Sequence, residues 1–205
     1  MKPSLILSLS LLVVLCFGCK TVPKDYTEFR KHQPRSILVL PPINNSTEVL
    51  GGYSFYTTVT RPIAELGYYV FPVVVVDQFL KENGLPMPDE MHQAPMDKLQ
   101  EVFGADAVLY VKISKYGSKY QVISANTVVE ASARLVDAKT GICIWENTVT
   151  AQGGGNSGLL EALVGQIVNK LTDQAHDVAT MAAAQLVSQP GQGLLLGPRH
   201  PQYKP

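Results

Sequence analysis

The 205-residue chain carries 17 basic and 17 acidic side chains, so its formal net charge is zero, and 46% of its residues are hydrophobic. A balanced charge lacks the basic surface that nucleic-acid binding requires, so we expect no nucleic-acid partner. The length is sufficient for one domain with a hydrophobic core and flanking tails.

The first nineteen residues, MKPSLILSLSLLVVLCFGC, have the layout of a cleavable signal peptide. Their apolar run over residues 5–17 is shorter than the roughly 20 residues needed to cross a bilayer. Gly18 and Cys19 then resemble the lipobox of bacterial lipoproteins, in which the cysteine is acylated and becomes the new N-terminus. The two residues before Gly18, Cys16 and Phe17, depart from the commoner lipobox residues. We predict a signal peptide over 1–18, cleavage between Gly18 and Cys19, and a lipid on Cys19 that anchors the protein to a membrane. An ordinary secretory signal cleaved nearby is the alternative.

Residues 19–35 are predicted to tether the domain to the membrane. The segment from Lys20 to Pro34 mixes charges with two prolines and has no hydrophobic period. As a flexible coil it would span about 20 Å. By resemblance to the lipoprotein sorting rule, the absence of Asp after Cys19 favours the outer membrane. We expect the periplasmic side, with the cell surface as the alternative.

The first half of the domain is predicted to alternate between strands and helices. A short apolar run at 37–40, ended by two prolines, indicates a buried strand. A helix is expected over 49–66, with Asn45 and Glu48 spaced as a capping box and Pro62 kinking or splitting the helix. We then expect a strand at 68–71, a helix at 72–83, a loop at 84–95 and a helix at 96–103 that ends at Gly104. The four valines at 73–76 would also suit a strand.

From residue 107 the hydrophobic period changes to two, which indicates strands at 108–115, 127–136 and 142–150. Residues 137–141 supply a turn between the last two strands. The loop GGGNSG then leads into a long helix with apolar residues at steps of three and four, beginning near Leu160 and Val164. Residues 36–188 are therefore predicted to form one α/β domain, with a mixed sheet of about five strands packed by helices and a long C-terminal helix.

The last segment, 189–205, is rich in proline and glycine but contains three consecutive leucines, Leu194, Leu195 and Leu196. Three exposed leucines in a flexible tail would be unusual. We expect them to dock on their own domain, with contact to a partner as the alternative.

Four segments, ILVLPPINNST, PIAELGYYVFPV, FGADAVLYVKI and DAKTGICIW, resemble a family of bacterial lipoproteins of unknown function, over about Ser36 to His176. This resemblance implies an α/β domain similar to the amino-terminal domain of TolB. The GADA motif, the later TG turn and Trp145 are also similar to the CsgG class of envelope lipoproteins, which act in secretion. The family implies a role in envelope transport or assembly beside other lipoproteins and supplies no catalytic residues.

Candidate ligand contacts lie in two loops: Asn44, Asn45 and Ser46 at the end of the first strand, and Asn156 and Ser157 in GGGNSG. Turn and cap chemistry explains the first loop more simply, and a flexible crossover explains the second. GGGNSG lacks the Lys and Ser or Thr that complete a phosphate-binding loop.

No catalytic or metal-binding pattern is found in the sequence. The four histidines are scattered, and only Glu28 and His32 have the spacing of metal ligands. Cys143, the one thiol left if Cys19 is acylated and the signal removed, has apolar neighbours and is predicted to be buried and inert. We therefore expect no enzyme activity, no metal and no cofactor.

Two functions remain open. In the first, the protein is a non-enzymatic envelope module that binds other lipoproteins or secretion components through sheet edges, the leucine tail, or a surface formed by Tyr53, Tyr56, Tyr116 and Tyr120. Ordinary packing of these tyrosines is equally compatible with the sequence, and homo-oligomerisation stays open. In the second, the protein binds a small molecule or lipid, or is a degenerate enzyme, with a pocket beside the 41–46 and 153–158 loops.

Overall fold

The structure is a computed structural model that describes residues 24–121, 124–153 and 167–204. The predicted signal peptide and Cys19 lie outside the described residues, as do Asn156, Ser157 and the expected first turns of the long helix. The predictions made for these positions stay predictions.

Six strands form one mixed sheet in the order β3-β1-β4-β5-β6, with β2 paired to β4 beside this path. The strands are β1 (Ser36–Val39), β2 (Ile43–Asn44), β3 (Tyr69–Val70), β4 (Ala107–Gln121), β5 (Ser124–Asp137) and β6 (Cys143–Gly153). Strand β1 pairs in parallel with β3 and β4, and β2 pairs in parallel with β4, whereas β4, β5 and β6 form an antiparallel meander. The predicted mixed α/β fold is confirmed, with β2 as an added strand that is too short to show a hydrophobic period.

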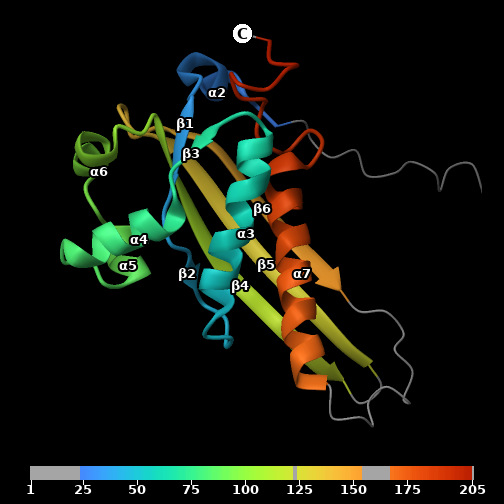
Figure 1. The fold of residues 1–205 in the computed structure, drawn as a ribbon. Coiled ribbons are helices and arrows are strands. Elements are labelled where there is room, and N and C mark those ends of the chain that lie inside the picture. The colour runs from blue at the N-terminus through green and yellow to red at the C-terminus, as the bar shows by residue number, and fades with distance from the viewer. Residues whose placement is uncertain (1–23, 122–123, 154–166, 205) are drawn as a thin grey trace, which may run out of the picture.

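The helices lie on both sides of this sheet (Figure 1). They are α2 (Thr27–His32), α3 (Gly51–Glu65), α4 (Val73–Glu82), α5 (Pro88–Met91), α6 (Met96–Phe103) and α7 (Ile167–Ser188). Helices α3 and α7 run side by side over one face of the meander, while α4, α5 and α6 gather near β1 and β3. The predicted long C-terminal helix is therefore present and covers the sheet.

Side-chain alternation divides the interior into two cores. Ile37 and Val39 of β1 enter the larger core under α3 and α7, whereas Leu38 enters the smaller core under α4 to α6. Further along the meander, the face away from α3 and α7 carries polar side chains instead. Its exposed members include Lys112, Arg134, Glu146, Thr148 and Thr150. Half of the sheet is thus covered on both faces, and half presents an open polar face.

The predicted tether is wrong at residues 27–32, which form α2. Phe29 of this helix is 4% exposed and joins the larger core. Burying an aromatic ring contributes more than the weak local helix preference of the segment. The domain therefore begins before Ser36.

The start of α3 and the segment after α4 also differ from expectation. No side chain caps α3 at Leu50, so the predicted capping box of Asn45 and Glu48 is wrong. The helix continues through Pro62 without splitting. The four valines lie in helix α4, and the expected loop at 84–95 contains α5, whose Met91 is fully buried.

The C-terminal tail docks on its own domain, as predicted. Leu194 is 7% exposed in the larger core, and Leu195 packs against that core. Three aromatic side chains donate hydrogen bonds to tail carbonyls: Tyr26 Oη to Gly193 O at 2.5 Å, Tyr68 Oη to Leu195 O at 2.6 Å, and Trp145 Nε1 to Gln192 O at 2.9 Å. These bonds satisfy tail carbonyls that would otherwise lose water on docking.

Candidate functional site

In the predicted ligand-binding loop at Asn44, Asn45 and Ser46, the polar groups form hydrogen bonds within the loop and to nearby backbone groups. Asn44 Oδ1 accepts from Ser46 N at 3.1 Å and from Ser46 Oγ at 2.7 Å, and Asn44 Nδ2 donates to Glu48 O at 2.7 Å. Asn45 N donates to Ile113 O at 2.9 Å. These contacts hold the turn between β2 and α3, in agreement with turn chemistry rather than ligand binding.

The predicted tyrosine surface is wrong for two of its members. Tyr56 is 2% exposed and donates to Val39 O at 2.9 Å, and burial raises the pKa of its phenol. Tyr116 is 8% exposed and packs in the larger core. Tyr53 is exposed and accepts a hydrogen bond from Lys81, while the side chain of Tyr120 lies outside the described residues.

Cys143 is exposed, so its predicted burial is wrong. Cys143 is the first residue of β6, and the pairing with β5 shifts by one residue directly after it. As a result, the consecutive residues Ile144 and Trp145 are both buried. A bulge changes the alternation of facing side chains, and no hydrophobic pattern reveals its position.

One pair of side chains resembles a nucleophile and base and was not predicted. Ser54 Oγ lies 3.0 Å from His176 Nδ1 and accepts a hydrogen bond from Tyr116 Oη at 2.6 Å. The residues are 122 positions apart in sequence, so no local motif signals them. A working triad also needs a group that orients the histidine ring, and among the described residues no acidic partner of His176 is found.

The Glu28 and His32 spacing does not lead to a metal site in the described part of the chain, where no group of three or more His, Cys, Asp or Glu side chains comes together suitably. His32 instead places Nδ1 3.2 Å from Asp137 Oδ2, with Glu28 Oε2 3.8 Å from its Nε2. This contact links α2 to the turn between β5 and β6.

The outer edge of β6 is an open edge of the sheet. Strand β6 ends the strand order, so no strand pairs with its outer side among residues 24–121, 124–153 and 167–204. Lys24 Nζ donates to Glu146 O, which places the backbone of Glu146 at this outer side. Because backbone groups alternate along a strand, Thr148 and Thr150 present their N–H and C=O groups to the same edge.

Protection of this edge is limited to its beginning. Lys24 and α2 lie against the first residues of β6, and Lys24 also sits 5.7 Å from the centre of the Trp145 ring. Thr148 N donates to Asn147 Oδ1 of its own strand at 2.9 Å, and beyond this N–H no such cover is present in the described structure. An exposed edge of this kind is a template for pairing with a further strand.

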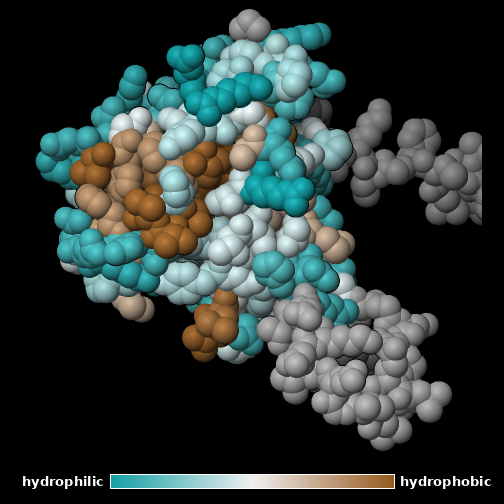
Figure 2. Space-filling view, viewed as in Figure 1, coloured by the Kyte–Doolittle hydropathy of each residue, from teal (hydrophilic) through white to brown (hydrophobic). Residues whose placement is uncertain are grey.

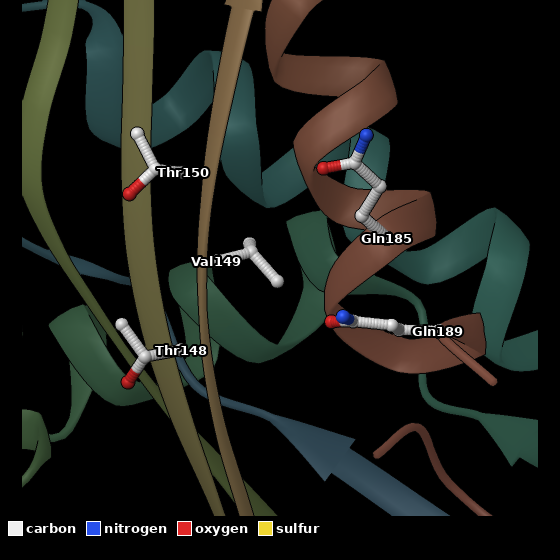
Figure 3. A pocket seen from close by; sticks show the side chains of 5 residues that line it. All are labelled: Thr148, Val149, Thr150, Gln185 and Gln189. Carbon is white, nitrogen blue, oxygen red and sulfur yellow. The ribbon is translucent and has the colours of Figure 1, made fainter. Parts of the chain in front are cut away.

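A groove of about 430 Å³ follows the open part of β6 (Figure 3). Its walls are Thr148, Val149 and Thr150 of β6 and Gln185 and Gln189 of α7. Val149 points toward α7, whereas Thr148 and Thr150 point to the opposite side of the strand. The lining carries no charge, and both glutamine side chains are exposed. The site thus combines edge backbone groups, of which the Thr148 N–H is already bonded to Asn147 Oδ1, with a neutral groove whose one apolar lining residue, Val149, is 6% exposed.

Apolar surface gathers elsewhere, over α4 and its neighbours (Figure 2). Its exposed members are Tyr69 of β3, Val74 and Val75 of α4, and Val102 of α6. The adjoining strand β3 has only two residues, so this surface offers side-chain contact but little backbone pairing. Among the described residues, no helix has the length and apolar character needed to cross a bilayer.

Comparison with known proteins places the chain among lipoproteins. Residues 24–199 match the model of a family described as "Putative lipoprotein GNA1162-like". The chain is 41% identical to a putative lipoprotein of Neisseria meningitidis serogroup B, over the full length of both. The crystal structure of lipoprotein GNA1162 from Neisseria meningitidis is 40% identical, with a TM-score of 0.57 over 68% of this chain and 99% of that chain. A PelC dodecamer structure from Paraburkholderia phytofirmans shares the fold at 18% identity, with a TM-score of 0.52 over 84% of this chain and 94% of that chain. The predicted lipoprotein family is confirmed, and the chain belongs to the GNA1162-like family.

Proposed function

We propose that this protein is a membrane-anchored periplasmic lipoprotein that acts as a non-enzymatic protein-binding module in transport, secretion or assembly at the cell envelope. The observation that carries the proposal is the open outer edge of β6 beside a neutral groove. An extended segment of a partner adds to this edge as a further strand, through backbone hydrogen bonds. Other envelope lipoproteins, secretion components and a second copy of this chain are the candidate partners.

The chemistry of the groove limits the partner segment. Thr148 to Gly153 are six residues, so the open edge is about 20 Å long and accommodates a short extended peptide. The groove offers the exposed Gln185 and Gln189 amides beside Val149, which is 6% exposed, and carries no charge. A partner segment with small apolar or neutral polar side chains at alternate positions fits this surface, whereas a charged side chain would lose water without a counter-charge.

A non-enzymatic role is favoured because the Ser54–His176 pair does not line either of two hollows in the described structure, the groove beside β6 and a second hollow on the polar face of the sheet. Neither the groove beside β6 nor the hollow at Ile43 and His92 is lined by Ser54 or His176. Catalysis requires a nucleophile, its base and a substrate position within reach of one another.

The proposed lipid on Cys19 would set how the domain faces the membrane. Because the side chain of Lys24 contacts β6, only the chain from Cys19 to Lys24 connects the lipid to the domain. Five residue steps reach at most about 18 Å even when fully extended. The end of the domain that carries α2 and the C-terminal tail therefore faces the bilayer, which we propose to be the periplasmic side of the outer membrane. The open part of β6 runs away from this end (Figure 1).

Site-specific photocrosslinking in intact cell envelopes tests the partner site. A photoreactive residue at position 148 is expected to give a defined protein adduct that the same residue at the exposed position 61 on α3 does not. Adding Thr150→Pro removes an edge N–H and should abolish the adduct while preserving the fold, because proline is tolerated on edge strands. The matched control Thr150→Val keeps the N–H and should retain the adduct.

An adduct that survives Thr150→Pro would contradict strand addition. A co-purifying small molecule without any protein adduct would contradict the protein-binding function itself. An adduct between two copies of the chain would identify the partner as a second copy.

Metabolic labelling with a palmitate analogue tests the anchor separately. The protein is expected to be labelled, and Cys19→Ala should lose the label. An unlabelled protein, or a label that persists in Cys19→Ala, would refute lipid attachment at Cys19 without affecting the proposal for β6.

A further inference from the structure

A second hollow, of about 380 Å³, opens on the polar face of the sheet, away from the edge of β6. Its lining comes from β2, the end of α5, β4 and β5, and includes Ile43, His92, Tyr110, Lys112, Ser132 and Arg134. Four segments that are distant in sequence therefore meet around one space.

Strand register sets the spacing of the polar groups in this hollow. Lys112 of β4 pairs with Ser132 of β5, and Arg134 of β5 pairs with Tyr110 of β4. Lys112 and Arg134 are thus diagonal neighbours on the same face, with the Ser132 hydroxyl beside them. Diagonal positions are roughly 7–8 Å apart, within reach of two long side chains that converge on one ligand.

A chain of ring contacts holds Arg134 in place. Its Cζ lies 5.8 Å from the centre of the Tyr110 ring, which in turn meets the His92 ring edge-on at 5.3 Å. His92 Nε2 lies 2.9 Å from Pro41 O, so these side-chain contacts lead from Arg134 to a backbone carbonyl. Stacking on an aromatic face leaves the N–H groups of a guanidinium free to bind an anion.

The basic side chains of this face differ in whether they form an ion pair with a carboxylate. Lys115 is paired with Glu130 at 2.5 Å. Among the described residues, neither Lys112 nor Arg134 has a carboxylate within ion-pair distance. Two acidic groups lie near this region: Glu146, opposite Arg134 in register, and Asp89, which interacts electrostatically with His92. Two adjacent cations without a paired carboxylate repel each other until an anion binds between them.

We propose that this hollow binds the phosphate group of a phosphomonoester. Lys112, Arg134 and the Ser132 hydroxyl donate hydrogen bonds to its oxygens, while Tyr110 and Ile43 contact the organic part next to the phosphate. A phosphomonoester carries a charge of about −1.5 to −2 at pH 7, which matches two monovalent cations better than a single carboxylate does. The ester is either a soluble metabolite or a lipid headgroup, since both present the same chemistry.

Two binding measurements on the full chain in neutral detergent distinguish these sources. Equilibrium dialysis with radiolabelled glycerol 3-phosphate detects a soluble ligand, and native mass spectrometry from micelles doped with phosphatidic acid detects a lipid ligand. We expect one equivalent per chain in at least one arm. Arg134→Gln and Lys112→Gln should each weaken binding about tenfold or more, since each removes a charge-assisted hydrogen bond.

Lys115→Gln is the matched control, because Lys115 lies on the same face but is already paired with Glu130. Its binding is expected to stay within about twofold of the parent. All three lysine and arginine positions are exposed, and circular dichroism melts of each variant check that the fold is kept. Arg134→Lys, which keeps the charge but loses the planar fork, should give an intermediate loss. Absence of saturable binding in both arms, or an equal loss in Lys115→Gln, would overturn the proposal.

Discussion

Docking of the C-terminal tail yields a sharp stability prediction at Leu194. This side chain is 7% exposed and belongs to the larger core, although it lies in a segment rich in glycine and proline. Truncating a buried leucine to alanine costs about 2 to 5 kcal/mol, from lost burial and the cavity left behind. For Leu194→Ala we expect about 3 kcal/mol, the lower part of that range, because the tail can partly collapse into the space.

In a chain of this size each kcal/mol changes Tm by about 2 to 4 °C, so Leu194→Ala should lower Tm by about 6 to 12 °C. Thermal unfolding followed by circular dichroism at pH 7 measures this change. The matched control is Leu50→Ala, at a leucine that is 67% exposed, and its effect should stay within about 0.5 kcal/mol.

Trp145 supplies an independent signal for the same event. Its indole Nε1 donates to Gln192 O, two residues before Leu194, and it is the only tryptophan in the chain. Weaker packing of the tail in Leu194→Ala should let it detach at a lower temperature than in the parent, and the tryptophan emission should then shift to longer wavelength before global unfolding. Equal melting temperatures for Leu194→Ala and Leu50→Ala would refute tail docking.

Three further predictions concern single contacts. Gly51→Ala should destabilise the fold, because the new Cβ would lie 2.7 Å from Tyr116 Cγ, although replacing a helical glycine usually stabilises a protein. Urea unfolding measures the change in unfolding free energy, and a gain in stability would contradict this close approach. Tyr68→Phe should cost about 1 to 3 kcal/mol in the same assay, since Leu195 O loses its donor, and an unchanged midpoint would show that water replaces the hydroxyl. Burial alone would raise the pKa of Asp137, but hydrogen bonds from Thr140, with a contribution from His32, lower it below its usual value. A lowered folded-state pKa stabilises the protein above the unfolded pKa of about 3.9, so Asp137→Asn should be less stable than the parent at pH 7, with the difference shrinking as pH falls below about 4; a constant difference would contradict the shift.

The candidate site shows where local sequence patterns stop being informative. The strand that forms it was predicted at 142–150 from its period of two, close to the observed Cys143–Gly153. That it would be an edge strand, with α7 placed to form a groove, depends on Gln185 and Gln189, which lie more than thirty residues further on. The Ser54–His176 contact and the meeting of His92 with Arg134 are likewise long-range. A sequence pattern reports the neighbours of a residue along the chain, whereas a site depends on neighbours in space.

Local signals in the sequence predict the three strands of the meander, although β4 continues to Gln121 instead of ending at 115, as well as the turn at residues 137–141 and the end of α6 at Gly104, and they favour docking of the leucine tail over its contact with a partner. Each of these follows from a local signal: a period, a turn residue, a positive φ of 63° at Gly104, or an apolar run that would not stay in water. Other features depend on the assembled fold: Phe29 anchors a segment predicted to be a tether, Tyr56 is buried while Cys143 is exposed, and two residues at 43–44 form a strand. Their free energy comes from contacts with distant segments, and these contacts exist only once the sheet and its two helix layers have assembled.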